Sequence, residues 1–214
     1  MLESRTLFAA FAHIDANKVL VVDGTEAADK ISLTYSGLSV TVSLNGKSQV
    51  FDRDLMQDNS DLTQVRINGY AGNDRIIADF NTPLNIAVYA GAGNDVVSTG
   101  RGRDFVSGGD GNDTINGGFY NDVLYGDAGA DLIQGSDGRD LIKGGGGNDI
   151  LAGNGGNDVV YGNGGRDVLT GGSGDDSLYG GIGIGDTLIG QTGNDYAAYD
   201  PGDRYLDKIE QLVK

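Results

Sequence analysis

An apolar side chain returns at every ninth residue through most of the second half of the chain. A helix does not explain this spacing, because nine residues make about two and a half helical turns and successive apolar side chains would face opposite sides. The pattern instead predicts a strand of three residues, with its apolar side chain pointing inward, followed by a glycine-rich turn of six residues. The apolar residues are Val97, Val106, Ile115, Leu124, Ile133, Ile142, Leu151, Val160, Leu169, Leu178, Leu188 and Ala197.

An aspartate stands two residues before each apolar residue; we number the aspartate position six of the repeat and the apolar residue position eight. One residue is inserted before Asp186, and residues 68–76 fit the same frame around Asp74, with twelve extra residues before the next repeat. Two repeats make one coil, so stacked coils place the aspartates in two columns whose members are eighteen residues apart. The aspartates are Asp95, Asp104, Asp113, Asp122, Asp131, Asp140, Asp149, Asp158, Asp167, Asp176, Asp186 and Asp195.

The two ends of the chain lack this regularity, and we expect three parts. Residues 1–66 alternate as strands, with a two-residue hairpin at Asn45 and Gly46, and predict a small antiparallel β section that covers the first coil. Residues 24–32 echo the repeat, so this part has degenerate coils as an alternative. Residues 67–199 form the repeat region, and residues 200–214 offer a C-terminal cap through Tyr205, Leu206, Ile209, Leu212 and Val213.

Charge and composition narrow the possible partners. The chain has 15 basic and 31 acidic residues, a formal net charge of −16, so we expect cations as partners and no nucleic acid. It has no cysteine, which excludes disulfides and thiolate chemistry. No run approaches the ~18 apolar residues of a membrane span. Residues 7–12 are the most apolar early stretch; we interpret them as a first strand or cap, with a trimmed start as the alternative.

The aspartate columns call for a metal ion. At the strand spacing of ~4.8 Å, neighbouring carboxylates repel by roughly 1 kcal/mol even in water. A calcium ion relieves this repulsion, because it takes six to eight oxygen ligands from carboxylates and backbone carbonyls. Magnesium fits the turn less well, and zinc prefers nitrogen and sulfur ligands in a chain that has one histidine. We expect about eight calcium ions, with the two oxygens of a mid-column aspartate such as Asp149 serving ions above and below.

The repeat resembles the G-G-x-G-x-D-x-U-x nonapeptide of RTX, or hemolysin-type, calcium-binding proteins. Full or near matches are GGDGNDTIN at 108–116, GGGGNDILA at 144–152 and GGSGDDSLY at 171–179, and the resemblance covers about residues 68–199. It implies an all-β fold, a right-handed parallel β-roll (a β-solenoid), in which turn carbonyls complete the calcium sites. The position-one glycines implied as carbonyl donors are Gly108, Gly117, Gly126, Gly135, Gly144, Gly153, Gly162 and Gly171.

Some repeats depart from this pattern. Tyr120 replaces the glycine of position four, Asp127 that of position two and Thr99 that of position one, and the insertion before Asp186 affects the register of the last sites. The asparagines of position five are interpreted as turn residues that tolerate unusual φ. His13 is interpreted as an ordinary N-terminal residue, and Arg103, Arg139 and Arg166 as surface charges.

The outward positions form two stripes. Position seven places Val96, Thr114, Leu132, Ile150 and Val168 on one flat face, and position nine places Tyr125, Tyr161 and Tyr179 on the other. A continuous apolar stripe indicates a contact, for which packing of the N-terminal section and self-association are the alternatives.

Catalytic motifs are missing from the sequence. H-E-x-x-H needs two histidines, G-x-S-x-G does not occur, and a Ser-His-Asp triad would depend on His13, so we expect no enzyme. The leading hypothesis is a secreted calcium-binding β-roll, extracellular or at the cell surface, that folds with calcium and has a structural or surface role. The alternatives are an adhesin or polysaccharide-binding module with a surface glycan or protein partner, and the RTX part of a larger secreted protein. Position three has no threonine ladder, which argues against ice binding.

Overall fold

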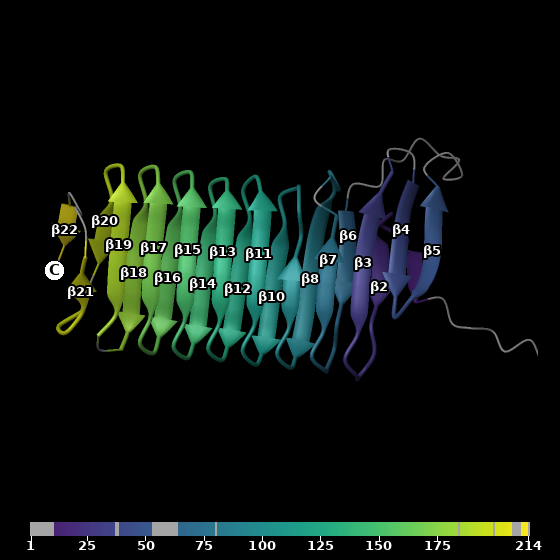
Figure 1. Cartoon of the computed structure of the whole chain (residues 1–214), viewed down its shortest axis with the longest axis horizontal. Coiled ribbons are helices and arrows are strands. Elements are labelled where there is room, and N and C mark those ends of the chain that lie inside the picture. Colours follow the sequence, from purple (N-terminus) through teal and green to yellow (C-terminus); the bar gives the residue numbers. More distant parts are fainter. Residues whose placement is uncertain are drawn as a thin grey trace, which may run out of the picture.

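The computed structural model describes residues 11–36, 39–52, 64–79, 81–183, 185–198, 200–206 and 211–213. Over these residues the chain is all-β, without a helix, and its strands form two eleven-stranded sheets. Figure 1 shows the strands stacked side by side along one long axis. None of the described residues belongs to a helix that could cross a membrane. Residues 7–10 of the early apolar stretch, and Ile209 of the expected cap, lie outside the described residues.

Successive strands of the repeat region alternate between the two sheets. Sheet A contains, in spatial order, β1 (Ala12–Ile14), β2 (Leu20–Asp23), β6 (Gln64–Asn68), β8 (Asn85–Ala92), β10 (Phe105–Asp110), β12 (Val123–Ala128), β14 (Leu141–Gly146), β16 (Val159–Gly164), β18 (Ser177–Ile182), β20 (Tyr196–Ala198) and β22 (Gln211–Val213). Sheet B contains β21 (Arg204–Tyr205), β19 (Thr187–Thr192), β17 (Val168–Ser173), β15 (Ile150–Gly155), β13 (Leu132–Asp137), β11 (Thr114–Phe119), β9 (Val96–Ser98), β7 (Arg75–Ala78), β3 (Lys30–Tyr35), β4 (Ser39–Leu44) and β5 (Lys47–Asp52).

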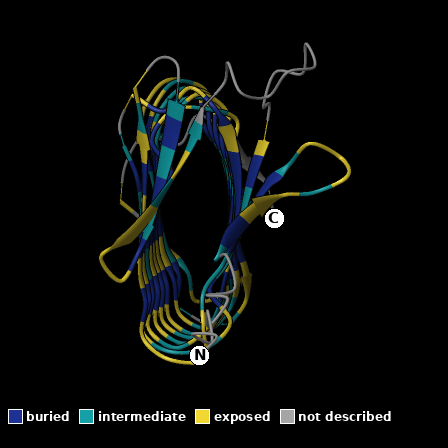
Figure 2. Cartoon of the chain, turned by 90° about the vertical axis from the view of Figure 1, so that its right-hand side faces the viewer, coloured by how far each residue is buried: buried dark blue, intermediate teal, exposed yellow. Residues whose placement is uncertain are grey.

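The position-eight side chains form the core between the two sheets. All twelve are at most 1% exposed, so the inward phase predicted from the nine-residue pattern is confirmed. Parallel pairing keeps them in register: Ile133 lies opposite Ile115 on one side and Leu151 on the other. Figure 2, seen along the long axis, shows the buried residues lining both sheets and exposed residues gathered in the turns. The fold is the parallel β-solenoid that the repeat predicted.

Most strands of the repeat region are longer than predicted. They run for six residues, as in β11 and β13, where three were expected, because the backbone ladder continues past the apolar segment. In the β11–β13 pair the register includes Asn116 with Gln134 and then Gly118 with Ser136, so position one is passed over and positions two and three pair again. The pairing is therefore interrupted at position one while the chain stays within the sheet.

The N-terminal part combines both expected arrangements. The hairpin at Asn45 and Gly46 is confirmed, since both residues have positive φ (50° and 81°) between antiparallel β4 and β5. However, β2 pairs in parallel with β6, and β3 with β7, so these two strands continue the solenoid as a degenerate coil. Antiparallel β1 and the β3–β4–β5 meander then extend the edges of the two sheets. The division at residue 66 stays a prediction.

The far end continues the same stacking. β21 pairs in parallel with β19, and β22 pairs in parallel with β20, so short strands extend both sheets there. Leu206 is 64% exposed, so this member of the expected cap does not pack against the core. The apolar residue was expected to be covered, but it follows the last paired residue of β21; its amide still donates to the Leu188 carbonyl of β19 at 3.4 Å, while its side chain stays exposed.

The two outward stripes lie where the alternation of side chains predicted them. On sheet B, Leu132, Ile150 and Val168 are adjacent in the ladder and remain exposed. The N-terminal strands extend the sheets instead of covering this stripe, so the packing alternative does not hold among the described residues. Self-association through the stripe stays a prediction. On sheet A, Tyr161 and Tyr179 pair directly, with ring centroids 4.6 Å apart.

Candidate metal centre

Backbone hydrogen bonds between coils hold the aspartates in two columns. The amide of Asp131 donates to Oδ1 of Asp149 at 2.8 Å, and the same bond joins Asp140 to Asp158 in the other column. Each aspartate of position six is at most 2% exposed. The one-residue insertion leaves the ladder intact, since Asp167 still donates to Asp186 at 2.8 Å. One carboxylate oxygen of each aspartate is therefore committed to the backbone of the preceding coil.

The second carboxylate oxygen, Oδ2, has no hydrogen-bond partner although it is buried. A buried carboxylate oxygen without a partner is costly, so its presence in every repeat requires an explanation. Oδ2 therefore accepts no hydrogen bond, whereas Oδ1 accepts one; that both oxygens of a mid-column aspartate serve ions stays a prediction. The aspartates with such an Oδ2 are Asp74, Asp95, Asp104, Asp113, Asp122, Asp131, Asp140, Asp149, Asp158, Asp167, Asp176, Asp186 and Asp195.

Burial makes the charged form of these side chains unfavourable. The pKa of Asp122 is raised to about 8, chiefly by desolvation and also by neighbouring aspartates, against the opposing hydrogen bond from the Asp104 amide. Desolvation likewise raises the pKa of Asp113 and of Asp176 to about 7. A positive charge beside Oδ2 reverses this effect, because it favours the carboxylate over the protonated acid.

At the position-one glycines from Gly108 to Gly162, a backbone carbonyl of the next coil lies close to the free Oδ2. A Cβ on Gly126 would clash with Oδ2 of Asp131 and would lie 2.6 Å from the carbonyl oxygen of Gly144 in the next coil. A Cβ on Gly153 would likewise clash with Oδ2 of Asp158 and lie 2.7 Å from the Gly171 oxygen. Glycine at this position thus lets a carboxylate oxygen and a carbonyl oxygen face the same small volume.

The other glycines of the repeat have a different role, which is backbone conformation. Positions two and four have positive φ, as at Gly109 (107°) and Gly111 (134°). The departures Tyr120 and Asp127 occupy these positions, and both adopt φ near 75°. Asp122 and Asp131, which follow them, are buried with a free Oδ2 like the others. These departures therefore leave the carboxylate columns unchanged.

The asparagines of position five form a third ladder at the surface. Oδ1 of Asn94 accepts from the Asn112 amide at 2.8 Å, and Oδ1 of Asn148 accepts from the Arg166 amide at 2.9 Å. Neither asparagine has positive φ, so the interpretation that they tolerate unusual φ is wrong. Their side chains instead satisfy the amides of the next coil.

Three members of the columns, Asp29, Asp74 and Asp203, were not predicted as site residues from the sequence. Asp29 lies at the start of the first column, where its amide donates to Oδ1 of Asp74 at 2.8 Å. Asp203 lies at the other end and accepts from the Asp186 amide at 3.1 Å. The repeat frame around Asp74, and its echo in residues 24–32, were the signals that pointed to the first two. Asp203 had no such signal, because it lies in a turn outside the glycine pattern.

The donor set fits a hard divalent cation. No three acidic or histidine side chains gather as a metal cluster within the ranges that the structure describes, so carboxylates alone do not make a site. The turns from Gly108 to Gly162 instead offer one buried carboxylate oxygen beside a backbone carbonyl oxygen, as Asp131 and Gly144 do. Calcium accepts mixed carboxylate and carbonyl oxygens in flexible geometry, whereas zinc prefers nitrogen and sulfur. When bound, the ion supplies a positive charge to the desolvated carboxylates.

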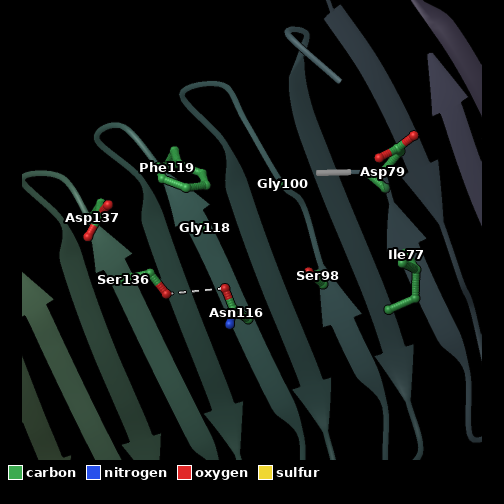
Figure 3. A pocket seen from close by; sticks show the side chains of 10 residues that line it. Ile77, Asp79, Ser98, Gly100, Asn116, Gly118, Phe119, Ser136 and Asp137 are labelled. Atoms are coloured by element: carbon green, nitrogen blue, oxygen red, sulfur yellow. Dashed lines mark hydrogen bonds between the residues drawn. The ribbon is translucent and has the colours of Figure 1, made fainter. Parts of the chain in front are cut away.

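A shallow hollow of about 550 Å³ lies over sheet B and the segments that follow its strands (Figure 3). It is lined by residues that include Asp79, Phe119 and Asp137, and the Ser136 hydroxyl in it donates to Asn116 Oδ1 at 3.3 Å. No histidine lines it, so its serines have no imidazole base beside them. Its geometry therefore supports no catalytic assignment.

The fold and the turns define a class of protein: a parallel β-roll whose turns present buried carboxylate and carbonyl oxygens to metal ions. The model of the RTX calcium-binding nonapeptide repeat family matches residues 65–81, 89–124, 107–140, 116–151, 125–160 and 152–185, which together make up more than half of the chain. The chain belongs to this family. A search of curated proteins finds no match. RTX repeats bind calcium, and the oxygen donors of the turns agree with this.

Proposed function

We propose that this chain is a secreted β-roll, extracellular or at the cell surface, whose folding is driven by calcium bound to both aspartate columns, and that its role is structural. The observation that carries the proposal is the series of buried, unpartnered Oδ2 atoms that recurs in every repeat. Such a series destabilises a metal-free fold, so that binding of a cation adds directly to the free energy of folding.

The proposed ligands are the carboxylates of position six, with Asp74 added, and the carbonyls of the position-one residues. In the middle of the ladder the pairs are Asp131 with Gly144 and Asp140 with Gly153, because in each pair the two oxygens face the same position-one glycine. We keep the number of about eight ions as part of the proposal, since calcium needs more oxygens than one carboxylate supplies.

Circular dichroism tests the proposal. The metal-free chain, prepared with EDTA, should show less strand signal and a lower melting temperature than the chain in millimolar calcium, and magnesium should restore little of either. A spectrum and melting temperature that stay the same with and without chelator would contradict calcium-driven folding.

The polysaccharide-binding alternative has one supporting observation, the aromatic row of sheet A. Stacking argues against it as a sugar platform, however, because the rings of Tyr161 and Tyr179 lie nearly parallel (12°) with centroids 4.6 Å apart. Each ring thus covers a face of the other. We therefore favour the structural role, and a pull-down with extracellular polysaccharides distinguishes the two.

A further inference from the structure

Position one decides whether a turn has room for an ion. In the repeats from Gly108 to Gly171 it is glycine, and a Cβ there would clash with the free Oδ2 of the same repeat. The two repeats before this run differ, with Ala90 and Thr99 at position one. Thr99 is the more informative of the two, because its side chain carries a hydroxyl at a position where the glycines from Gly108 to Gly171 have no side-chain atom.

Thr99 makes a side-chain hydrogen bond that a glycine at position one cannot make. It is 1% exposed, and its Oγ1 donates to the carbonyl oxygen of Gly117 at 2.7 Å. Gly117 is the position-one residue of the next coil, so its carbonyl corresponds to that of Gly144 beside Asp131. The pKa of the Asp104 carboxyl is raised to about 6, because burial outweighs the opposing effects of the Ile86 amide and the Thr99 hydroxyl.

Asp104 is the first carboxylate of its column. Its amide donates to Oδ1 of Asp122, whereas its own Oδ1 accepts from Ile86, which is not an aspartate. The other column begins in a comparable way. Oδ2 of Asp29 accepts from the amide of Thr25 at 2.6 Å and from its hydroxyl at 3.1 Å. Each column thus starts with a carboxylate near a threonine, but the two threonines differ in position and contact. Thr25 follows the position-one Gly24 and donates to the carboxylate itself, whereas Thr99 occupies position one and donates to a carbonyl, so that Asp104 Oδ2 accepts no hydrogen bond.

We propose that Thr25 and Thr99 end the calcium ladder at the first carboxylate of each column, so that the coils of Asp29 and Asp104 are held without calcium. This inference rests on the proposed function. Calcium needs six to eight oxygens, and at Asp104 the threonine takes the Gly117 carbonyl as a hydrogen-bond acceptor and fills the space beside it. In its column calcium binding then begins at Asp122. Asp104 is therefore removed from the proposed ligands.

The test is a calcium titration of the full chain with the bound ions counted by equilibrium dialysis and mass spectrometry. Thr99→Gly gives this repeat the position-one residue of its neighbours and should add one ion. Thr99→Ser keeps the hydroxyl and should leave the number unchanged. Gly135→Thr is the reciprocal change in the middle of the same column, where φ is not positive and a Cβ would clash with Asp140 Oδ2; it should remove one ion.

The outcomes separate the two proposals. If the parent chain binds calcium and Thr99→Gly binds the same number of ions, the threonine proposal is wrong while calcium-driven folding stands. A parent chain that binds no calcium overturns both. If Thr99→Gly does not fold, as judged by circular dichroism, Gly135→Thr decides: loss of one ion supports the role of position one, and an unchanged number overturns it.

Discussion

In the proposed calcium sites the two oxygens of each column aspartate have separate tasks, and single substitutions can separate them. Oδ1 of Asp149 accepts from the Asp131 amide at 2.8 Å, while its Oδ2 is buried without a partner. Asp149→Asn keeps an acceptor for the amide and removes the charge, whereas Asp149→Ala removes both. The pair therefore distinguishes the structural hydrogen bond from the metal ligand.

For Asp149 we expect both variants to bind fewer calcium ions than the parent. In chelator, Asp149→Ala should lose about 1–3 kcal/mol of unfolding free energy, because the buried Asp131 amide loses its partner. Asp149→Asn should lose less, since no charge is buried. Urea denaturation with and without calcium measures both effects. Equal stability of the two variants in chelator would show that the hydrogen bond contributes little.

The inward phase of position eight gives a second prediction at this scale. Leu151→Asp should destabilise the calcium-bound chain by more than ~3 kcal/mol, because it places an unpaired charge between the two sheets at a fully buried position. Thr170→Asp, at a partly exposed outward position of the paired strand, should cost less than ~1 kcal/mol. Comparable losses in denaturation experiments would mean that the inward and outward positions are assigned wrongly.

At the scale of the strands, the outer face of sheet A has a row of ring contacts that crosses several coils. Lys143 lies between two tyrosines, with its Nζ 5.2 Å from the ring centroid of Tyr125 and 5.8 Å from that of Tyr161. Tyr161 in turn stacks on Tyr179. Cross-strand pairs of this kind stabilise neighbouring strands in a sheet. The row therefore supports coil stacking from outside the core.

Tyr161→Ala tests this row. It removes the stacking and one cation–π contact, and we expect a loss of about 1–2 kcal/mol in calcium. Thr170→Ala, on the outer face of the other sheet, is the control and should change stability by less than ~0.5 kcal/mol. The measurement is chemical denaturation at saturating calcium. A loss equal to that of the control would mean that the rings contribute no stability beyond that of a surface residue.

At the scale of the whole molecule, the columns make the metal-free fold sensitive to pH. Their folded pKa values are raised above the usual 3.8 of an aspartate, to about 8 at Asp122 and about 7 at Asp113. Between pH ~4 and ~8 the folded state therefore binds more protons than the unfolded state, and its stability falls as the pH rises. Calcium acts in the opposite direction, because it binds the carboxylates and competes with protons.

Differential scanning calorimetry checks the sign of this effect. Protein freed of calcium on a chelating resin should melt at a higher temperature at pH 5 than at pH 8, and added calcium should raise the melting temperature more at pH 8. Calcium is removed on the resin before the measurement, because dissolved chelators lose affinity for calcium in acid. Metal-free protein that is more stable at pH 8 would contradict the raised pKa values.

Much of the fold follows from the sequence, because its determinants repeat locally. An apolar residue at a fixed phase needs an interior to face, and a spacing of nine residues is incompatible with a helix, so inward residues such as Leu151 and the two columns through Asp131 and Asp140 were predictable. The hairpin at Asn45 and Gly46 was predictable for the same reason, since its turn depends on two adjacent residues with positive φ.

Only the tertiary structure decided what depends on contacts between coils. Oδ1 of Asp149 meets an amide that is eighteen residues away in sequence, so which oxygen remains for a metal is set by stacking. The same holds for Asp29, Asp203 and the hydrogen bond from Thr99 to Gly117, which irregular segments bring into register with the repeats. Position-one glycine looked like a carbonyl donor in a flexible turn, but the packed coils show that it also keeps side-chain atoms away from a carboxylate. A repeat determines the conformation of one turn, whereas the partner of each buried oxygen is determined by the neighbouring coil.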